Sequence, residues 1–499
     1  MRIQELRDKV DDFLTELTRE TYQAMAGIKE EARISAIYDK YSECFQRDSL
    51  ELIEAEFESA KDEYEKRRLK LLREFVALSY LDHKVRGIRE EVLNREARAE
   101  VEHPEGPIPF RLSFIKLKNE PLREAREKIS RSQEDVIKGL EPLLKRGEEI
   151  IQEECPSYID MFHELSGIAL EPLNEMGRQF LKDTEDAYRE HLSWFLRRNL
   201  KLKPSQAKRH DMEFLLRGME YDPHFPERDL MELASKLVLR MGMDLRAEGK
   251  IRFDMEPRPR KTPRAFCAAV RVPEEVYLTV APAGGYKSYH DFLHELGHAL
   301  HHAYVSPEEP MEFKRLGDYS VTEAYAFIFD RLMLSPVALK KSFGIAPDKD
   351  MMRFFTFGEL YLLRRYFAKL SYELELHKAT PLEGKDEIYQ GLLSKATGVE
   401  YPKALYLYDV DPHFYCARYL RAWLAEATLY FYLRDRYDED WFRSERAGAF
   451  LRELFSRGQR YMIDEIIADL AVRPPKEGAG GGEKMRLEPL KERVLEHLG

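Results

Sequence analysis

Apolar side chains recur at intervals of three and four residues from Ile3 to about Met241, with interruptions at prolines. This spacing is typical of amphipathic helices, because residues three and four apart lie on one face of a helix. Between Leu50 and about Ala99 the sequence has no proline, and Gly87 is its one strong helix breaker. We therefore expect one or two long helices in this stretch.

The period of the apolar positions changes between Lys250 and Pro282. Three short segments there are rich in valine, phenylalanine and tyrosine and are separated by turns that contain proline, which predicts a small sheet. The predicted strands are Arg252–Met255, Ala265–Val270 and Val276–Val280. A turn at Ala283–Gly285 follows, and the helical pattern then returns from Tyr286 to about Leu470.

The C-terminal part of the chain has a different composition. Residues Arg473–Gly482 include consecutive prolines and a run of glycines, which cannot sustain a helix, so we expect a flexible linker there. A short amphipathic helix is predicted from Leu487 to Leu498. The 499 residues are enough for more than one lobe. We expect a helical N-terminal lobe (residues 1–200), a region with the sheet (201–472) and the linker with its terminal helix (473–499).

Charged residues make up 34% of the chain, and the formal net charge is -11 at pH 7. Basic residues are interleaved with acidic residues along the predicted helices and form no basic tract, so we expect no nucleic-acid partner. The longest apolar stretches are far shorter than the roughly 20 residues that cross a bilayer, so we expect no membrane span. The N-terminal residues Met1–Glu5 include an acid and show no signal-peptide pattern, which favours a cytoplasmic location.

The four cysteines, Cys44, Cys155, Cys267 and Cys416, are widely separated and form no C-x-x-C pair. In a chain of this length, such a distribution indicates reduced and mostly buried thiols. It argues against a disulfide framework and against a structural zinc site.

Residues His294–His298 contain the motif H-E-x-x-H within a helical pattern. Two histidines four residues apart lie on the same helix face, so their imidazoles can converge on one ion, and the adjacent Glu295 projects toward water on that ion. Catalytic zinc takes three protein ligands and keeps one open position, so a third ligand must come from elsewhere in the chain. The motif therefore predicts His294 and His298 as metal ligands and Glu295 as the general base.

Five acidic residues downstream are candidates for the third ligand: Glu308, Glu309, Glu312, Asp318 and Glu323. The first three lie in or beside the proline-flanked stretch Ser306–Pro310, where a carboxylate is ordinarily solvated. Glu323 lies among apolar residues on a predicted helix, where an unpaired buried carboxylate is costly and a metal ion supplies the compensating charge. Glu323 is therefore the predicted third ligand. These ligand types favour zinc, although cobalt or manganese also accept them.

These residues resemble the active site of the zinc oligopeptidases, the family that includes thimet oligopeptidase and oligoendopeptidase F. That family has H-E-x-G-H-A-x-H followed by a glutamate on a second helix. His294–His301 match the motif, and Glu323 follows His298 by 25 residues. The resemblance implies a mainly helical protein with a zincin-like metallopeptidase domain over residues 201–472 and an additional helical lobe that encloses a substrate channel.

The resemblance extends upstream of the motif. Phe253–Asp254 and Ala265–Phe266 are similar to the family's strand before the active site, which would pair with the backbone of a bound peptide. The family's usual glycine before the alanine–aromatic pair is Arg264 in this chain. The family's acidic residue about seven positions before the third ligand is Leu316 here, and Asp318 is expected to take its role.

Downstream, Asp411–Tyr419 is similar to the family's segment of histidines and tyrosines, which contact the substrate and the oxyanion. The resemblance implies these roles for His413, Tyr415 and Tyr419. The alternative is that the two tyrosines are core aromatics, because tyrosines at helical spacing are usually packing residues. The chain departs from the family at Arg421 and Trp423, where further tyrosines are usual.

The function that the resemblance implies is the hydrolysis of peptide bonds in short oligopeptides, with one zinc ion per chain. Zinc lowers the pKa of its bound water to about 7, and Glu295 accepts the proton as this water attacks the carbonyl. Gly297 would let another segment pack close to the metal helix. His301 and His302 would be turned away from the metal, either beside its ligands or at the surface, and packing is favoured over ligation for both. Two alternatives stay open: a Taq-type metallocarboxypeptidase, and a helical scaffold protein that binds metal without turnover. The sequence does not indicate the oligomeric state.

Overall fold

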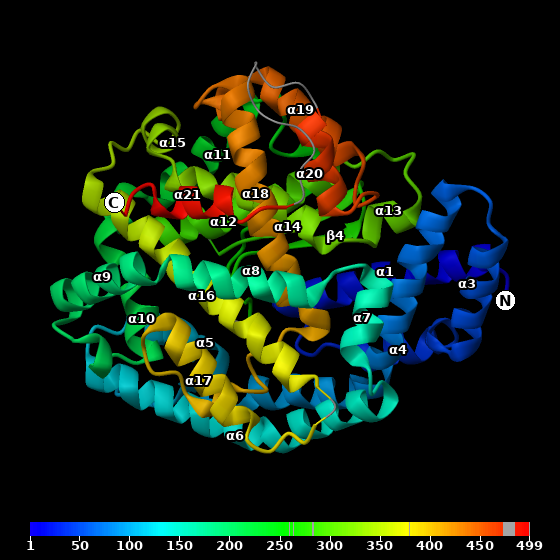
Figure 1. The fold of residues 1–499 in the computed structure, drawn as a ribbon, viewed down its shortest axis with the longest axis horizontal. Coiled ribbons are helices and arrows are strands. Elements are labelled where there is room, and N and C mark those ends of the chain that lie inside the picture. The colour runs from blue at the N-terminus through cyan, green and yellow to red at the C-terminus, as the bar shows by residue number, and fades with distance from the viewer. Residues whose placement is uncertain (259, 263, 282–283, 379, 473–484, 499) are drawn as a thin grey trace. The chain divides into compact units, whose positions relative to one another are not determined.

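The computed structural model describes the protein except for residues 259, 263, 282–283, 379, 473–484 and 499. The described chain is mainly helical and contains two small sheets, which confirms the predicted fold class at this level (Figure 1). It forms two compact units, each made of three separate stretches. Unit 1 comprises Met1–Tyr80, Met219–Met352 and Arg418–Arg493, and unit 2 comprises Leu81–Gly218, Arg353–Ala417 and Val494–Gly499.

Unit 1 contains the three-stranded sheet and most of the C-terminal helices. Its strands are β3 (Ile251–Asp254), β4 (Phe266–Arg271) and β5 (Glu275–Thr279). Its helices are α1 (Ile3–Met25), α2 (Ile34–Lys40), α3 (Arg47–Ser59), the first part of α4 (Glu63–Arg98), α11 (Leu230–Arg240), α12 (Tyr286–Tyr304), α13 (Met311–Arg315), α14 (Tyr319–Asp330), α15 (Pro336–Lys341), the start of α16 (Lys349–Leu376), most of α18 (Tyr415–Tyr437), α19 (Glu445–Ser456), α20 (Ile463–Val472) and most of α21 (Glu488–Leu495).

Unit 2 contains the remaining parts of α4, α16, α18 and α21, together with a short two-stranded sheet that the sequence does not predict. The strands are β1 (Glu100–Val101) and β2 (Ile108–Pro109), which pair antiparallel. The other helices are α5 (Phe110–Asn119), α6 (Arg123–Glu154), α7 (Tyr158–Ser166), α8 (Leu170–Asp183), α9 (Glu185–Phe195), α10 (Arg209–Leu215) and α17 (Lys385–Thr397).

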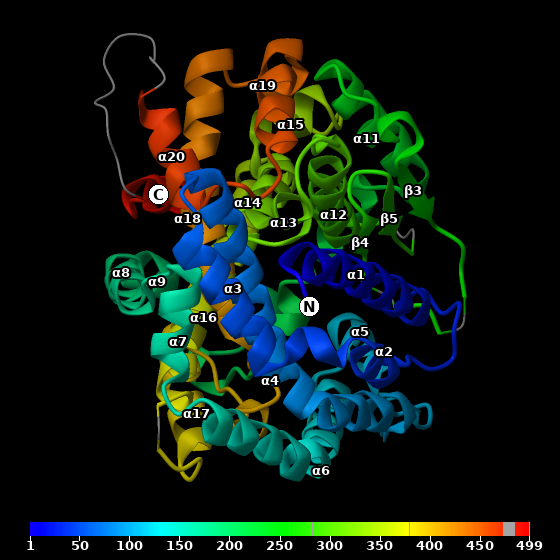
Figure 2. The same ribbon diagram turned by 90° about the vertical axis from the view of Figure 1, so that its right-hand side faces the viewer.

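The three-stranded sheet of unit 1 has the order β3-β5-β4, with β3 parallel and β4 antiparallel to β5. All three strands lie where the sequence predicts them. On one face, Ala268 and Tyr277 pack against Tyr22 and Ala26 at the end of α1, and the rings of Tyr22 and Tyr277 stack 4.1 Å apart. Helix α12 also packs against β4 and β5 (Figure 2).

The contact of α1 with the sheet explains why the units differ from the predicted regions. The lobe predicted over residues 1–200 is divided, because its first 80 residues belong to unit 1 with the sheet and the others to unit 2. The helical period of α1 predicts that one face is buried, but it does not say which element covers that face. The predicted boundaries at residues 200 and 472 therefore follow the order of the chain, whereas the units combine distant stretches.

The helix predictions for the two ends of the chain are confirmed. The stretch from Leu50 to Ala99 forms α3 and α4, and the predicted terminal helix is α21. The linker predicted at Arg473–Gly482 lies outside the described residues. All four cysteines are free, and two of them are buried. Among the described helices, none combines the length and the apolar character that crossing a membrane requires.

Candidate metal centre

Helix α12 carries both predicted histidine ligands and begins directly after a turn at Gly285. This glycine has φ 104°, in the region that favours glycine, and a Cβ there would lie 2.4 Å from Oδ1 of Asp222. The same Oδ1 accepts a hydrogen bond of 3.2 Å from the backbone N–H of Tyr286, the first residue of the helix. Farther along, the hydroxyl of Tyr289 donates a 2.6 Å hydrogen bond to the carbonyl of Pro226. These contacts determine where α12 begins and how it is oriented in unit 1.

Helices α12 and α14 approach each other closely at Gly297. A Cβ on Gly297 would lie 2.6 Å from Cα of Ala326 and 2.9 Å from the carbonyl oxygen of Tyr325. A larger residue would push the helices apart, which explains a glycine here despite its cost of roughly 1 kcal/mol in a helix interior. The prediction that Gly297 lets another segment pack against the metal helix is confirmed, and that segment is α14.

Three side chains from these two helices converge at one point. Nε2 of His294 and Nε2 of His298 each lie 3.4 Å from Oε2 of Glu323, and the two imidazole centroids are 4.9 Å apart. The three candidate ligand atoms all lie within 4.8 Å of one another. Glu323 is only 3% exposed, so its carboxylate lies inside the protein, as predicted. This triad could hold a metal ion, and no other group with such geometry occurs among the described residues.

The outer nitrogen of each imidazole is hydrogen-bonded to a side chain of α14. Nδ1 of His294 lies 2.8 Å from Oδ2 of Asp330, and Nδ1 of His298 lies 2.9 Å from Oγ1 of Thr322. Partners of this kind fix the tautomer and the orientation of metal-binding imidazoles, and here they direct both Nε2 atoms toward Glu323. Helix α14 therefore supplies the carboxylate of the triad and both partners of the histidines.

Neither Asp330 nor Thr322 is predicted from the sequence. Asp330 follows Glu323 by seven residues, about two helical turns, so this spacing was the signal that could have identified it. Asp318 was expected to be the acid that supports the metal ligands, but the carboxylate that contacts a histidine of the triad is that of Asp330. Asp318 instead caps the N-terminus of α14, where its Oδ1 accepts a 3.1 Å hydrogen bond from the backbone N–H of Ser320.

The charges at the triad favour a bound cation. Burial alone would lower the pKa of His294, but its hydrogen bonds with Asp330 and Glu323 raise that pKa well above its usual value. Burial alone would raise the pKa of Glu323, but His298 and His294 hold it far below its usual value. The carboxylates thus stabilise positive charge at this point, carried either by an imidazole or by a metal ion. Two imidazole nitrogens and a carboxylate oxygen are donors that zinc accepts, so the residues fit zinc.

The carboxylate of Glu295 lies between the metal helix and the sheet. Its Oε2 accepts a 2.8 Å hydrogen bond from the backbone N–H of Cys267 in strand β4. Burial raises the pKa of Glu295, and the charges of His298 and His294 oppose this shift only in part. A raised pKa strengthens a carboxylate as a proton acceptor, which suits the predicted role of general base.

Tyr419 belongs to unit 1 and lies in an aromatic group next to His294. The ring of Phe327 lies 5.2 Å from the imidazole of His294, and the ring of Tyr419 lies 6.2 Å from that of Phe327. The indole of Trp423 stacks on the ring of Phe327, with the ring centroids 4.6 Å apart and an angle of 10° between the ring planes. The position of Trp423 therefore has a packing explanation, because its indole supports Phe327, the residue next to the imidazole.

His413 and Tyr415 belong to unit 2. Nε2 of His413 lies 3.0 Å from Oδ1 of Asp82, and its Nδ1 lies 2.9 Å from the hydroxyl of Tyr158, so both ring nitrogens have a partner. His413 has φ 54°, which is uncommon for a residue other than glycine. Tyr415 is the first residue of α18. The catalytic roles predicted for His413 and Tyr415 stay predictions.

His301 is the last histidine of the sequence motif His294–His301, and it is not part of the triad. It is fully buried, and its ring centroid lies 5.0 Å from that of Tyr325 and 5.8 Å from that of Phe455. Burial lowers the pKa of this imidazole to about 3, so it is neutral at ordinary pH. These contacts confirm the predicted packing role.

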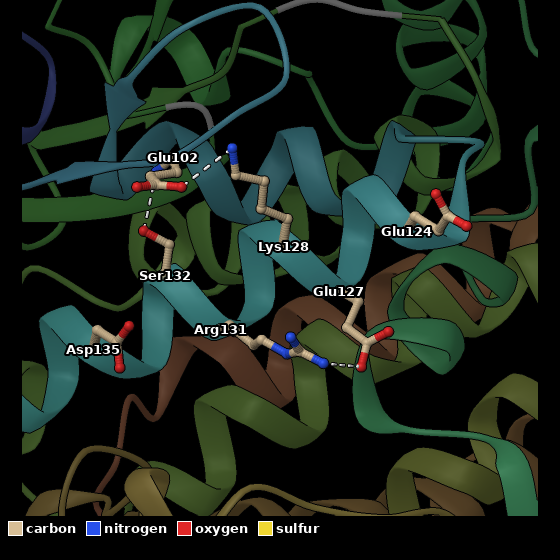
Figure 3. Close-up of a pocket in the computed structure, with 7 residues that line it drawn as sticks. All are labelled: Glu102, Glu124, Glu127, Lys128, Arg131, Ser132 and Asp135. Atoms are coloured by element: carbon tan, nitrogen blue, oxygen red, sulfur yellow. Dashed lines mark hydrogen bonds and ion pairs between the residues drawn. The ribbon is translucent and has the colours of Figure 1, made fainter.

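A hollow of about 420 Å³ in unit 2 offers no comparable metal site (Figure 3). It is lined by Glu102, Glu124, Glu127, Lys128, Arg131, Ser132 and Asp135. Lys128 pairs with Glu102 at 3.2 Å, and Arg131 pairs with Glu127 at 2.8 Å. Two of its acids are therefore already neutralised by neighbouring cations, and no histidine takes part.

No protein-family model matches the chain, and no curated protein matches it. The candidate metal centre therefore rests on the geometry of its own side chains.

Proposed function

We propose that the protein is a zinc metallopeptidase that hydrolyses peptide bonds in short oligopeptides. The observation that carries this proposal is the convergence of His294, His298 and Glu323, whose ligand atoms lie within 4.8 Å of one another. Three protein ligands with an open fourth position are typical of catalytic zinc sites. A site that only stored zinc would not need an adjacent carboxylate with a raised pKa, so Glu295 favours catalysis over a scaffold role.

Unit 1 would then contain a zincin-like catalytic domain. The support is the order of its elements, in which a small sheet is followed by α12 with the motif and by α14 with the third ligand. Strand β4 lies at the edge of the sheet, and the backbone N–H of Cys267 is directed at Glu295. An extended peptide that paired with this edge would bring its backbone close to the general base. The substrate channel stays a prediction.

The side chains of the candidate metal centre have distinct parts in the proposed reaction. Zinc bound at the triad would lower the pKa of a water molecule to about 7 and polarise the peptide carbonyl. Glu295 would accept the proton of the attacking water and pass it to the leaving amine. Asp330 and Thr322 would hold the imidazoles in place. Tyr419 is our choice for the hydroxyl that donates to the oxyanion, because it lies in unit 1 near His294.

The proposal is tested by comparing the wild type with Glu295→Gln. Glutamine keeps the shape of the side chain but cannot accept a proton, so we expect kcat/KM for a fluorogenic peptide to fall on the order of 10³-fold. Zinc content should stay at about one ion per chain in both proteins, because Glu295 is not a predicted ligand. Peptide hydrolysis and elemental analysis of the same preparations provide the two measurements.

Two further measurements define the activity. A chelator should abolish the hydrolysis by the wild type, and added zinc should restore it. A peptide blocked at its C-terminus should still be cleaved by an endopeptidase, whereas a carboxypeptidase would release residues only from the unblocked peptide. Equal activity of Glu295→Gln and the wild type would remove Glu295 from the mechanism, and hydrolysis that is indifferent to chelators would overturn the metallopeptidase proposal.

A further inference from the structure

A buried group of charges surrounds the N-terminus of α14. Oδ2 of Asp318 accepts a 2.7 Å hydrogen bond from Nη1 of Arg421 and a 3.1 Å hydrogen bond from the backbone N–H of Ile463. Its Oδ1 accepts from Nη1 of Arg418 at 3.4 Å and from the backbone N–H of Ser320 at 3.1 Å. Asp318 is 2% exposed, and each arginine is 3% exposed. All of these residues belong to unit 1.

The two arginines connect Asp318 to other elements of unit 1. Nη2 of Arg418 donates a 2.5 Å hydrogen bond to the carboxylate of Glu74 in α4. Arg421 also donates to the hydroxyl of Ser320 at 3.0 Å and pairs with Asp464 near the start of α20. Helices α14, α18 and α20 therefore meet at one buried carboxylate, and Arg418 connects α4 to it. We call Asp318, Arg418 and Arg421 the α14 clamp.

The α14 clamp is better suited to fixing geometry than to adding stability. Buried charges lose hydration, and apolar side chains of similar volume often stabilise a protein as well as a buried ion pair does. Burial alone would raise the pKa of Asp318, but Arg421 and Arg418 lower it to about 2, so this carboxylate stays charged. A charged carboxylate that accepts four hydrogen bonds has few alternative positions.

The helix that the clamp holds carries three groups of the candidate metal centre. Glu323 lies five residues after Asp318, and Thr322 and Asp330 are the hydrogen-bond partners of the two histidines. A metal site tolerates deviations of only about 0.2 Å in its ligand distances. The contact at Gly297 allows α14 to come close to α12, but this contact by itself does not prevent α14 from sliding along α12 or rotating against it. An anchor at the helix N-terminus removes that freedom.

We propose that Asp318 and Arg421 are positioning residues that hold α14, and with it Glu323, at the place where the third metal ligand is needed. The inference rests on the proposed function and explains why the chain has an arginine at position 421, where the resembling family has further tyrosines. Arg421 does not touch the triad in this account. It acts through Asp318 and the rigid helix that follows.

Arg421→Met tests the proposal, because methionine fills a similar space without the charge. We expect the affinity for zinc, measured by competition with a chromogenic chelator, to fall on the order of 10-fold. We also expect kcat to fall more than KM changes, because the substrate would still bind while the ligands are displaced. Arg421→Lys keeps the positive charge and should recover most of the zinc affinity.

The matched control is Arg7→Met. Arg7 is also buried in unit 1, and it pairs with Glu65 and Glu312, neither of which lies on α14. Thermal unfolding of the metal-free proteins should show that both methionine variants are destabilised, while only Arg421→Met loses zinc affinity. Equal losses of zinc affinity in the two variants would reduce the clamp to general stability and overturn the proposal.

A second variant covers the case in which Arg421→Met does not fold. Asp318→Asn keeps the size of the side chain and removes its charge. Like Arg421→Met, it should lower the affinity for zinc. If a folded Asp318→Asn protein bound zinc as tightly as the wild type, the positioning inference would be overturned, but the proposed function would not. A wild type that binds no zinc would overturn the proposed function as well, so the two failures are distinguishable.

Discussion

Two histidines, one in each unit, have a carboxylate beside the imidazole and differ in what the other ring nitrogen meets. In unit 1, Asp330 lies next to Nδ1 of His294, and Nε2 faces Glu323 at 3.4 Å. In unit 2, Asp82 lies next to Nε2 of His413, and a tyrosine hydroxyl lies next to Nδ1. A carboxylate partner therefore does not by itself make a histidine a metal ligand. The second nitrogen must also be directed at further donors.

Two acids with little solvent exposure, Glu323 in unit 1 and Glu148 in unit 2, differ in a similar way. Two imidazoles hold the pKa of Glu323 far below its usual value, against the effect of burial. Burial raises the pKa of Glu148 in unit 2 to about 7, because the charge of Arg89 offsets only part of the cost. Nδ1 of His377 lies 3.4 Å from Oε2 of Glu148, but this oxygen accepts no hydrogen bond from the described residues. Positive charge is thus gathered around Glu323, whereas Glu148 is left to bind a proton.

Among the substitutions that test this comparison of the two units, Glu148→Gln should show the largest effect, and it sharpens the difference between the two acids. The pKa of Glu148 is about 7 in the folded protein and 4.5 ordinarily, so the folded state binds the proton more tightly. Wild-type stability should therefore fall as pH rises from about 4.5 to 7 and then stay low, by about 3 kcal/mol in total. Glutamine does not titrate and should remove this loss. Urea unfolding at pH 5 and pH 9 measures it, and parallel pH profiles of the two proteins would count against the raised pKa.

The next largest effect should come from removing the carboxylate partners of the two histidines. Asp330→Asn should lower zinc affinity by about 10-fold to 100-fold, because the orientation and basicity of His294 depend on that carboxylate. Asp82→Asn is the matched change beside His413 and should leave zinc affinity unchanged. Chelator competition measures both. An equal loss in the two variants would erase the distinction between the histidines.

Gly297→Ala should have the smallest effect and tests the approach of α12 and α14. The added methyl group would meet Cα of Ala326 at 2.6 Å, which costs about 2 kcal/mol, while alanine gains about 1 kcal/mol as a helix former. We expect a net loss of about 1 kcal/mol in the free energy of unfolding. Gly87→Ala is the control, because nothing lies within 4 Å of its Cβ position, and it should gain about 1 kcal/mol. If both changes stabilised the protein, the close helix contact would be excluded.

The sequence predicts the parts of the centre that depend on local spacing. Two histidines four apart must share a helix face, and a glutamate in an apolar helix needs a compensating charge, so the triad could be predicted before the structure was known. Asp330 could have been suspected from its spacing of seven residues, about two helical turns, after Glu323. Thr322 acquires its role only from the way α14 crosses α12, and no local pattern in the sequence indicates that crossing. Asp318 shows the same limit, because its partner Arg421 lies 103 residues away.

The fold, like the metal centre, has features that local sequence patterns predict and features that depend on contacts between distant residues. Helices and strands follow from periodicity, and the strands β3, β4 and β5 lie where it predicts them. The membership of α1 in the unit with the sheet depends on contacts such as that of Tyr22 with Tyr277, which join residues far apart in the sequence. Periodicity identifies a buried face but not its partner.

The central claim is that His294, His298 and Glu323 hold one metal ion together. The most direct test is the zinc content of the purified wild type and of three variants, His294→Ala, His298→Ala and Glu323→Ala, after dialysis against the same zinc solution. We predict about one zinc per chain in the wild type and far less in each variant, because a catalytic site has only three protein ligands. A wild type without zinc, or a variant that retains the full amount, would contradict the account.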